Sequence, residues 1–138
     1  MGASPPPRSS SAGRRAAAAQ ALGALGERLA AEHLERRGCT ILARNARLAC
    51  GEIDLVALDR DTLAFVEVKT TRRCGRTTDA GPLARLLPRQ RAGLRRLAGA
   101  WLAGTEHPPA RHVRLDAIGV CVDARGRLLS LDHVEGWW

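Results

Sequence analysis

The 138 residues of this chain are enough for one domain with a buried core and too few for two. Its 22 basic and 14 acidic side chains give a formal net charge of +8, which fits either a polyanionic partner or an ordinary basic soluble protein. One Phe, three Trp and no Tyr offer little aromatic surface for stacking single-stranded bases. The four scattered cysteines include no CxxC pair, so they indicate neither a zinc site nor a disulfide framework.

Residues 1–15 are rich in Pro, Ser and Gly, and we expect a disordered N-terminal extension there, followed by a single domain over residues 16–138. The arginines of this extension are not followed by a continuous apolar region and a cleavage site, so it does not resemble a signal peptide. No apolar run in the sequence is long enough to span a membrane. We therefore expect a protein of the reducing cytoplasm with no membrane partner.

A first helix is predicted over residues 16–37. Its apolar stripe consists of Leu22, Leu25, Leu29 and His33. Gly38 follows as the expected C-cap. His33 is expected to pack at the edge of the stripe rather than to bind a ligand.

A second helix is predicted with Pro88 in its first turn and Gly104 at its end. Its core stripe consists of Leu94, Leu97, Ala98, Trp101 and Leu102. Five strands are predicted at residues 40–43, 52–58, 62–70, 113–122 and 127–131. The expected order of elements is therefore α-β-β-β-α-β-β.

The strands at residues 52–58 and 62–70 are expected to form a hairpin whose turn is centred between Arg60 and Asp61. One face of this hairpin is apolar throughout and pairs Ile53 with Val68, Leu55 with Val66 and Ala57 with Ala64. The other face is apolar near the turn and ionic at the open end, with the pairs Leu58 and Leu63, Val56 and Phe65, Asp54 and Glu67, Glu52 and Lys69. This pattern is typical of a sheet that is covered on both faces and carries a charged site at one rim.

The same register places Asp54 directly opposite Glu67, with the Cβ atoms roughly 5 Å apart. Two carboxylates this close repel each other, so a shared proton, a cation or solvent must offset the repulsion. Paired carboxylate oxygens suit Mg²⁺ or Mn²⁺. Lys69 would share the face of Glu67, where it can neutralise part of the charge and orient an attacking water.

The alternative for these residues is an amphipathic strand with ordinary surface salt bridges. Against it, Lys69 is the only lysine in a chain with 21 arginines. A compact ammonium differs from a guanidinium in size, hydration and titration, so a single lysine two residues after a carboxylate indicates a specific task. We therefore favour a functional site.

Arginines are concentrated between residues 72 and 96, where only Asp79 opposes eight of them. This concentration predicts a surface that contacts phosphates without reading sequence. The candidate nucleic-acid-binding residues are Arg72, Arg73, Arg76, Arg89, Arg91, Arg95 and Arg96.

Two motifs carry a family resemblance: Gly-Glu-Ile-Asp-Leu at residues 51–55 and Phe-Val-Glu-Val-Lys-Thr at residues 65–70. Together they resemble the YraN-type family of uncharacterised bacterial proteins (uncharacterised protein family 0102). Residues 26–30 and the Arg-Leu-Asp of residues 114–116 extend the resemblance, which runs from about Leu22 to Val134. That family is similar to archaeal Holliday-junction resolvases. The resemblance implies an α/β restriction-endonuclease-like fold of three layers, with a central mixed β-sheet flanked by helices.

The resemblance also implies roles for individual residues. Asp54 and Glu67 would hold Mg²⁺ or Mn²⁺, joined by the Val68 carbonyl, and Lys69 would be the catalytic lysine of a PD-(D/E)xK nuclease. Glu27 would be the helix acid that completes the site. The helical pattern alone leaves Glu27 open between an inward position and a solvated one.

The sequence departs from the expected pattern in two places. Ile53 stands where the motif name would put Pro. Arg89 and Gln90 stand where the family has Lys in the second helix, and Gln90 shares the stripe line of Leu94, so it could face the site as a further catalytic residue. Asp116 recurs in the family, and a structural hydrogen bond is expected for it. The final Trp137 and Trp138 are expected to cap the core.

From these features we expect a metal-dependent nuclease that hydrolyses phosphodiester bonds, with structured or branched DNA favoured over RNA. The alternative is a nucleic-acid-binding protein that keeps the fold without significant cleavage. A protein-interaction module would leave the concentration of arginines unexplained. Resolvases of this fold act as dimers, so a homodimer is compatible with the resemblance, although no dimer surface can be identified in the sequence.

Overall fold

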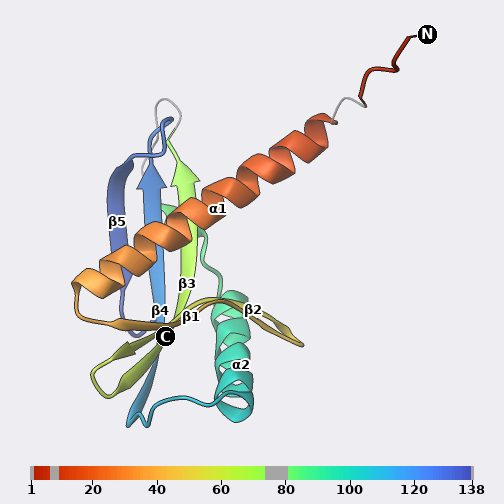
Figure 1. The fold of residues 1–138 in the computed structure, drawn as a ribbon. Coiled ribbons are helices and arrows are strands. Elements are labelled where there is room, and N and C mark those ends of the chain that lie inside the picture. Colours follow the sequence, from red (N-terminus) through yellow and green to blue (C-terminus); the bar gives the residue numbers. More distant parts are fainter. Residues whose placement is uncertain (1, 7–9, 74–80, 138) are drawn as a thin grey trace.

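The computed structural model describes residues 2–6, 10–73 and 81–137, with Arg85 described by its backbone alone. The described chain folds into two α-helices, one short 3₁₀ helix and five strands (Figure 1). In chain order these are α1 Ser11–Arg36, β1 Thr40–Leu48, β2 Gly51–Asp59, β3 Thr62–Arg72, η1 Pro82–Arg85, α2 Pro88–Gly104, β4 His112–Val122 and β5 Leu128–Val134. The predicted order of helices and strands is confirmed, with η1 as an addition.

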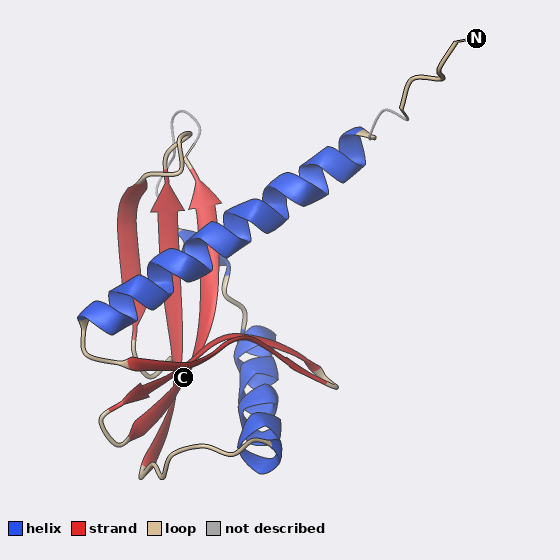
Figure 2. Ribbon diagram, viewed as in Figure 1, coloured by secondary structure: helices blue, strands red, loops and turns tan. Residues whose placement is uncertain are grey.

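The five strands form one sheet in the order β1-β2-β3-β4-β5. Neighbouring strands are antiparallel except β3 and β4, which are parallel, so the sheet is mixed. Helix α1 packs on one face and α2 on the other, each over its own hydrophobic cluster (Figure 2). The predicted three-layer α/β architecture is therefore confirmed.

Helix α1 begins at Ser11, five residues earlier than predicted, because the Ser10 hydroxyl accepts a hydrogen bond of 3.1 Å from the Gly13 amide and caps the helix. The residues 11–15 that were expected to be disordered are thus helical. Residues 11–21 are exposed, and this part of α1 extends beyond the sheet (Figure 1). The helix ends before Gly38, whose φ of 90° confirms the predicted C-cap.

The face of α1 that contacts the sheet differs slightly from the predicted stripe. Its buried residues are Gly26, Ala30, Ala31 and Leu34, whereas Leu22, Leu25 and Leu29 are only partly buried beside them. Small side chains at the centre let the helix backbone approach β3 closely. An added Cβ at Gly26 would overlap the Thr70 hydroxyl oxygen.

Strand β1 is longer than predicted, extending to Leu48 instead of ending at Ala43. It forms a hairpin with β2, and pairs Leu48 with Gly51. The outer half of β1 contains the exposed polar residues Arg44, Asn45 and Arg47 beside the half-buried Ala46 and Leu48. Pairing with β2 along the edge of the sheet makes this polar-rich segment a strand.

The hairpin of β2 and β3 has the predicted register from Asp59–Thr62 to Leu55–Val66. The predicted pairing of Asp54 with Glu67 is wrong, because the ladder ends at Leu55–Val66. The apolar face formed by Leu55 and Val66 packs against α1, as predicted, and Ile53 is the exception because it joins the cluster under α2.

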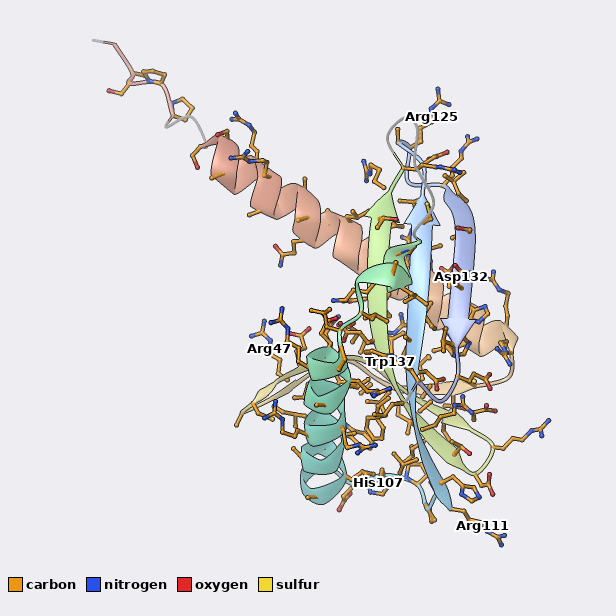
Figure 3. All side chains as sticks on the ribbon, turned by 180° about the vertical axis from the view of Figure 1, so that it is seen from behind. Arg47, His107, Arg111, Arg125, Asp132 and Trp137 are labelled. Atoms are coloured by element: carbon orange, nitrogen blue, oxygen red, sulfur yellow. The ribbon has the colours of Figure 1, made fainter. Side chains whose placement is uncertain are left out.

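Helix α2 packs on the sheet through Leu94, Ala98 and Trp101, which confirms its predicted stripe. Trp101 makes an edge-to-face contact with Phe65 at a centroid distance of 5.5 Å. Trp137 packs on the same cluster, between α2 and the sheet (Figure 3), while Trp138 lies outside the described residues. Neither α-helix in the described part of the chain has the length and apolar character needed to cross a membrane.

Candidate active site

The site forms where the hairpin of β1 and β2 changes direction. Leu55 packs toward α1, but Ile53, only two residues earlier, packs toward α2. The partner strand contains Asn45, whose φ is 49°, between the pairs Arg44–Leu55 and Ala46–Ile53. Asn is one of the few residues that adopt this left-handed conformation readily. Both strands therefore kink at the level of Asn45 and Asp54, which separates β2 from β3.

The Asp54 side chain enters the gap that this kink leaves. Its Oδ2 accepts a hydrogen bond of 2.7 Å from the Val68 backbone amide, which takes the place of the next ladder bond. The amide of a buried strand is thus satisfied by a side chain. The carboxylate of Asp54 reaches β3 beside Glu67, by insertion between the strands instead of the predicted cross-strand pairing.

Glu67 and Lys69 lie two residues apart on one face of β3. Their side chains form an ion pair, with Lys69 Nζ 2.9 Å from Glu67 Oε1. The Lys69 side chain is 34% exposed and the Glu67 side chain 22% exposed, so the pair is open to solvent and to a ligand. The only lysine of the chain therefore lies at the predicted position beside the carboxylates.

Glu27 reaches the same site from α1. Gly26 lets α1 lie directly on Thr70 of β3, and this close contact brings the following residue to the sheet. The Glu27 carboxyl hydrogen-bonds the side chains of Asn45 and Asp54. The structure thus brings together the four predicted residues Glu27, Asp54, Glu67 and Lys69.

The electrostatics of the site reflect this crowding of carboxylates. Burial, followed by the negative charge of Glu67, raises the pKa of Asp54 to about 7, although the Val68 amide and Lys69 oppose the shift. Burial also raises the pKa of Glu27, with a further contribution from Glu52, and the hydrogen bonds from Asn45 and Asp54 act against it. In the absence of a cation, Asp54 is therefore only partly ionised at neutral pH.

A cleft opens beside these residues, between α1 and the β1–β2 hairpin. It is lined by Gln20, Gly23, Ala24, Glu27, Asn45, Arg47 and Glu52. Sequence reasoning missed Asn45 and treated Glu52 only as a strand partner of Lys69. The one available signal was the presence of Asn inside a strand, where this residue is uncommon.

Gln90 has an interaction that the sequence did not suggest. Its Oε1 accepts a hydrogen bond of 2.8 Å from the Leu87 amide and caps the N-terminus of α2. This bond fixes the side chain at the start of its own helix. A catalytic role for Gln90 remains a prediction.

The arginines predicted to contact phosphate lie in two places. Four of them line a hollow on α2 together with Pro88 and Ala92, namely Arg89, Arg91, Arg95 and Arg96. Arg72 and Arg73 are at the far end of β3, next to the turn between β4 and β5 (Figure 1). Arg76 lies outside the described residues.

The tip of the β1–β2 hairpin contacts α2, since the Leu97 side chain lies against Gly51. Figure 3 shows Arg47 of this hairpin beside α2, at the end of the helix away from His107. Helix α2 contains no acidic residue. The four arginines of the hollow therefore have no acidic neighbour on their own helix.

The donor set suits a hard divalent cation that keeps much of its water. Among the described residues, no three His, Cys, Asp or Glu side chains are arranged to enclose a metal ion by themselves. Mg²⁺ is commonly bound through one or two carboxylates, with water and substrate oxygens as its other ligands. Asp54 and Glu67 fit this pattern, and a cation there would relieve the repulsion that raises the pKa of Asp54.

Comparison with known proteins gives one consistent result. The profile of the Uncharacterised protein family UPF0102 matches residues 26–120. A UPF0102 protein of Parafrankia sp. (strain EAN1pec) is 46% identical over 117 residues, which cover 85% of this chain and 95% of that protein. A UPF0102 protein of Acidothermus cellulolyticus is 52% identical over 96 residues, 70% of this chain and 69% of its own length. The matched residues 26–120 include Glu27, Asp54, Glu67 and Lys69, whereas β5 and the whole projecting part of α1 lie outside them.

Proposed function

The chain belongs to Uncharacterised protein family UPF0102, whose description assigns no activity, and we propose its function from its own site. The proposed function is that of a metal-dependent nuclease that hydrolyses phosphodiester bonds in nucleic acid, with structured or branched DNA as the favoured substrate. The observation that carries this proposal is the half-buried carboxylate of Asp54, held by the Val68 amide beside the Glu67–Lys69 ion pair. A surface salt bridge needs no second, partly protonated carboxylate at its side. A cation site can use such a carboxylate, because the bound cation displaces the proton and offsets the repulsion.

The residues that would hold Mg²⁺ or Mn²⁺ are Asp54, Glu67 and the Val68 carbonyl, with Glu27 at the edge of the set. The amide and carbonyl of one strand residue point to the same side of the strand. Since the Val68 amide donates to Asp54, the Val68 carbonyl is also directed toward β2. A cation at such a site polarises a phosphate and lowers the pKa of water.

The protein's own groups would then position the reactants. Lys69, paired with Glu67, can orient the attacking water and stabilise negative charge as it develops on the phosphate. Glu27 holds Asp54 in place through a hydrogen bond and is itself hydrogen-bonded to Asn45. The arginines of α2 supply contacts to the sugar–phosphate backbone, which position a substrate without reading its sequence.

The proposal is tested by incubating the full chain with branched, duplex and single-stranded DNA and with structured RNA, in Mg²⁺ or Mn²⁺ and in chelator. We expect cleavage only with the metal, and a loss of about 10²–10³-fold in the Lys69→Ala variant. Asp61→Ala, an exposed residue of the β2–β3 turn, is the control and should cleave like the wild type. Cleavage that survives both Lys69→Ala and Asp54→Ala would rule out this site.

The second candidate is a nucleic-acid-binding protein without significant cleavage. The arginine-lined hollow on α2 favours it, because phosphate contact requires none of the carboxylates. Binding that weakens with salt, is unaffected by chelator and leaves every substrate intact would support this candidate instead.

A further inference from the structure

A second polar cluster lies under the C-terminal part of α1 and centres on Asp116 of β4. The Asp116 side chain is fully buried and accepts four hydrogen bonds. They come from Arg114 Nε at 2.8 Å and Nη2 at 3.0 Å, from His133 Nε2 at 2.9 Å and from the Gly136 amide at 3.1 Å. The structural hydrogen bonding predicted for Asp116 is confirmed. Burial raises the pKa of Asp116, but the bonds from His133, Arg114 and Gly136 outweigh it, and the pKa is lowered.

The hydrogen bonds determine which nitrogens of the two histidines carry protons. His133 Nε2 donates to Asp116, so in the neutral ring Nδ1 is an acceptor. This Nδ1 lies 3.2 Å from Arg37 Nη1 and 3.1 Å from His33 Nε2. Since a guanidinium can only donate, and the Nδ1 lone pair is the sole acceptor at this point, His33 Nε2 must also carry a hydrogen. Both neutral rings therefore have the Nε2–H tautomer.

A positive charge on His33 is unfavourable in this arrangement. The Arg37 guanidinium and the His33 N–H converge on the same His133 nitrogen, so a protonated His33 would carry its charge beside that of Arg37. Burial, then His133 and the guanidiniums of Arg37 and Arg36, lower the pKa of His33, and Glu135 opposes them weakly. The charged groups around the pair are Asp116 and Arg114 of β4, Asp59 of β2, Glu135 after β5, and Arg36 and Arg37 at the end of α1.

The His33–His133 contact joins α1 to β5, two elements separated by 100 residues in the sequence. The ion pair between Arg37 and Glu135, at 2.8 Å, reinforces the same junction. Helix α1 is also held on the sheet by its buried face and by the close approach of Gly26 to Thr70 of β3. Glu27 directly follows Gly26 in this helix and lies six residues, or about 9 Å of helix, before His33.

We propose that His33 and His133 are positioning residues: with Asp116 they form a latch that is closed while His33 is neutral and that holds α1, and with it Glu27, at the carboxylate site. Acidification protonates His33, sets its charge against that of Arg37, loosens the C-terminal part of α1 from β5 and shifts Glu27. The role of Glu27 in catalysis rests on the proposed nuclease function. The latch itself is a property of the fold and is tested without metal or nucleic acid.

The test compares the thermal midpoint Tm of the wild type, His33→Gln and His112→Gln between pH 7.5 and pH 5.5. Gln keeps an N–H donor near the position of His33 Nε2 but does not titrate. A pKa lowered in the folded state means that the unfolded chain binds more protons below about pH 6.5, so stability is lost as the pH falls. We expect the wild type to lose about 5 °C more than His33→Gln on acidification. His112 is exposed, and its variant should behave like the wild type.

Solution NMR of the full chain provides the readout that a merely structural histidine would not change. Imidazole ¹⁵N spectra at pH 7.5 should show both rings as Nε2–H tautomers. The backbone amides of Gly26 and Glu27 should follow the His33 titration in the wild type and not in His33→Gln. Equal pH dependence of Tm in the two chains, or a His33 that titrates at or above its ordinary range, would overturn the latch while leaving the nuclease proposal untouched.

Discussion

Replacing Asp54 by Asn is expected to stabilise the fold at pH 8 and to abolish the proposed cleavage. The pKa of Asp54 is about 7 in the folded state, above its ordinary value of 3.8, so between these pH values the folded chain binds more protons than the unfolded one. The free energy of unfolding therefore falls as the pH rises through this window. An ionised Asp54 costs at most about 4 kcal/mol at pH 8. Asn is neutral and keeps an oxygen that can accept from the Val68 amide.

Denaturant unfolding at pH 4 and pH 8, without metal, measures this effect. The variant should gain up to about 4 kcal/mol over the wild type at pH 8 and little at pH 4, where both side chains are neutral. Asp61→Asn, at an exposed carboxylate, is the matched control and should change little at either pH. If the stability of the wild type does not fall relative to that of Asp54→Asn from pH 4 to pH 8, Asp54 is not a crowded, partly protonated carboxylate.

Replacing Gly26 by Ala is expected to lower the free energy of unfolding by about 3 kcal/mol, the upper end of the usual cost of overpacking. The new Cβ would overlap the Thr70 hydroxyl oxygen and lie only 2.7 Å from the Thr70 Cβ. Because the Cβ itself is in the way, and Thr is stiff about χ1, no side-chain rotation removes the overlap. Helix α1 must move away from β3, which also displaces Glu27 from Asp54 and Asn45.

The matched control is Gly23→Ala in the same helix, where an added Cβ meets nothing within 4 Å. This variant should be stabilised by roughly 0.5–1 kcal/mol, since Ala is the better helix former. Circular dichroism during denaturation gives both values. Adding Thr70→Gly to Gly26→Ala should recover part of the loss, although Gly weakens a strand. If Gly26→Ala is as stable as Gly23→Ala, the close contact of α1 with β3 is not present in solution.

Much of the fold could be predicted because its signals are local. The stripe of α2 from Leu94 to Trp101 follows from helical periodicity, and the turn at Arg60 and Asp61 fixes the register of β2 with β3. The outer half of β1 was not predictable in this way. Three of its residues are polar and exposed, and pairing with β2 makes the segment a strand.

The site was predicted in its residues but not in its geometry. Strand alternation extended past Leu55 would place Asp54 opposite Glu67, yet a left-handed Asn45 bends the hairpin and turns Ile53 to the opposite face. That bend depends on how the hairpin packs against α2, which no local pattern encodes. Likewise, the contact between His33 and His133 depends on chain segments 100 residues apart.

The central claim is that Asp54 and Glu67 bind a divalent cation, and calorimetric titration of Mn²⁺ into the full chain tests it most directly. Binding requires an ionised Asp54, whose pKa is about 7, so the affinity should rise about tenfold from pH 6 to pH 8. The Asp54→Asn variant should lose this binding at both pH values. Mn²⁺ binding that is independent of pH, or that persists unchanged in Asp54→Asn, would contradict the account.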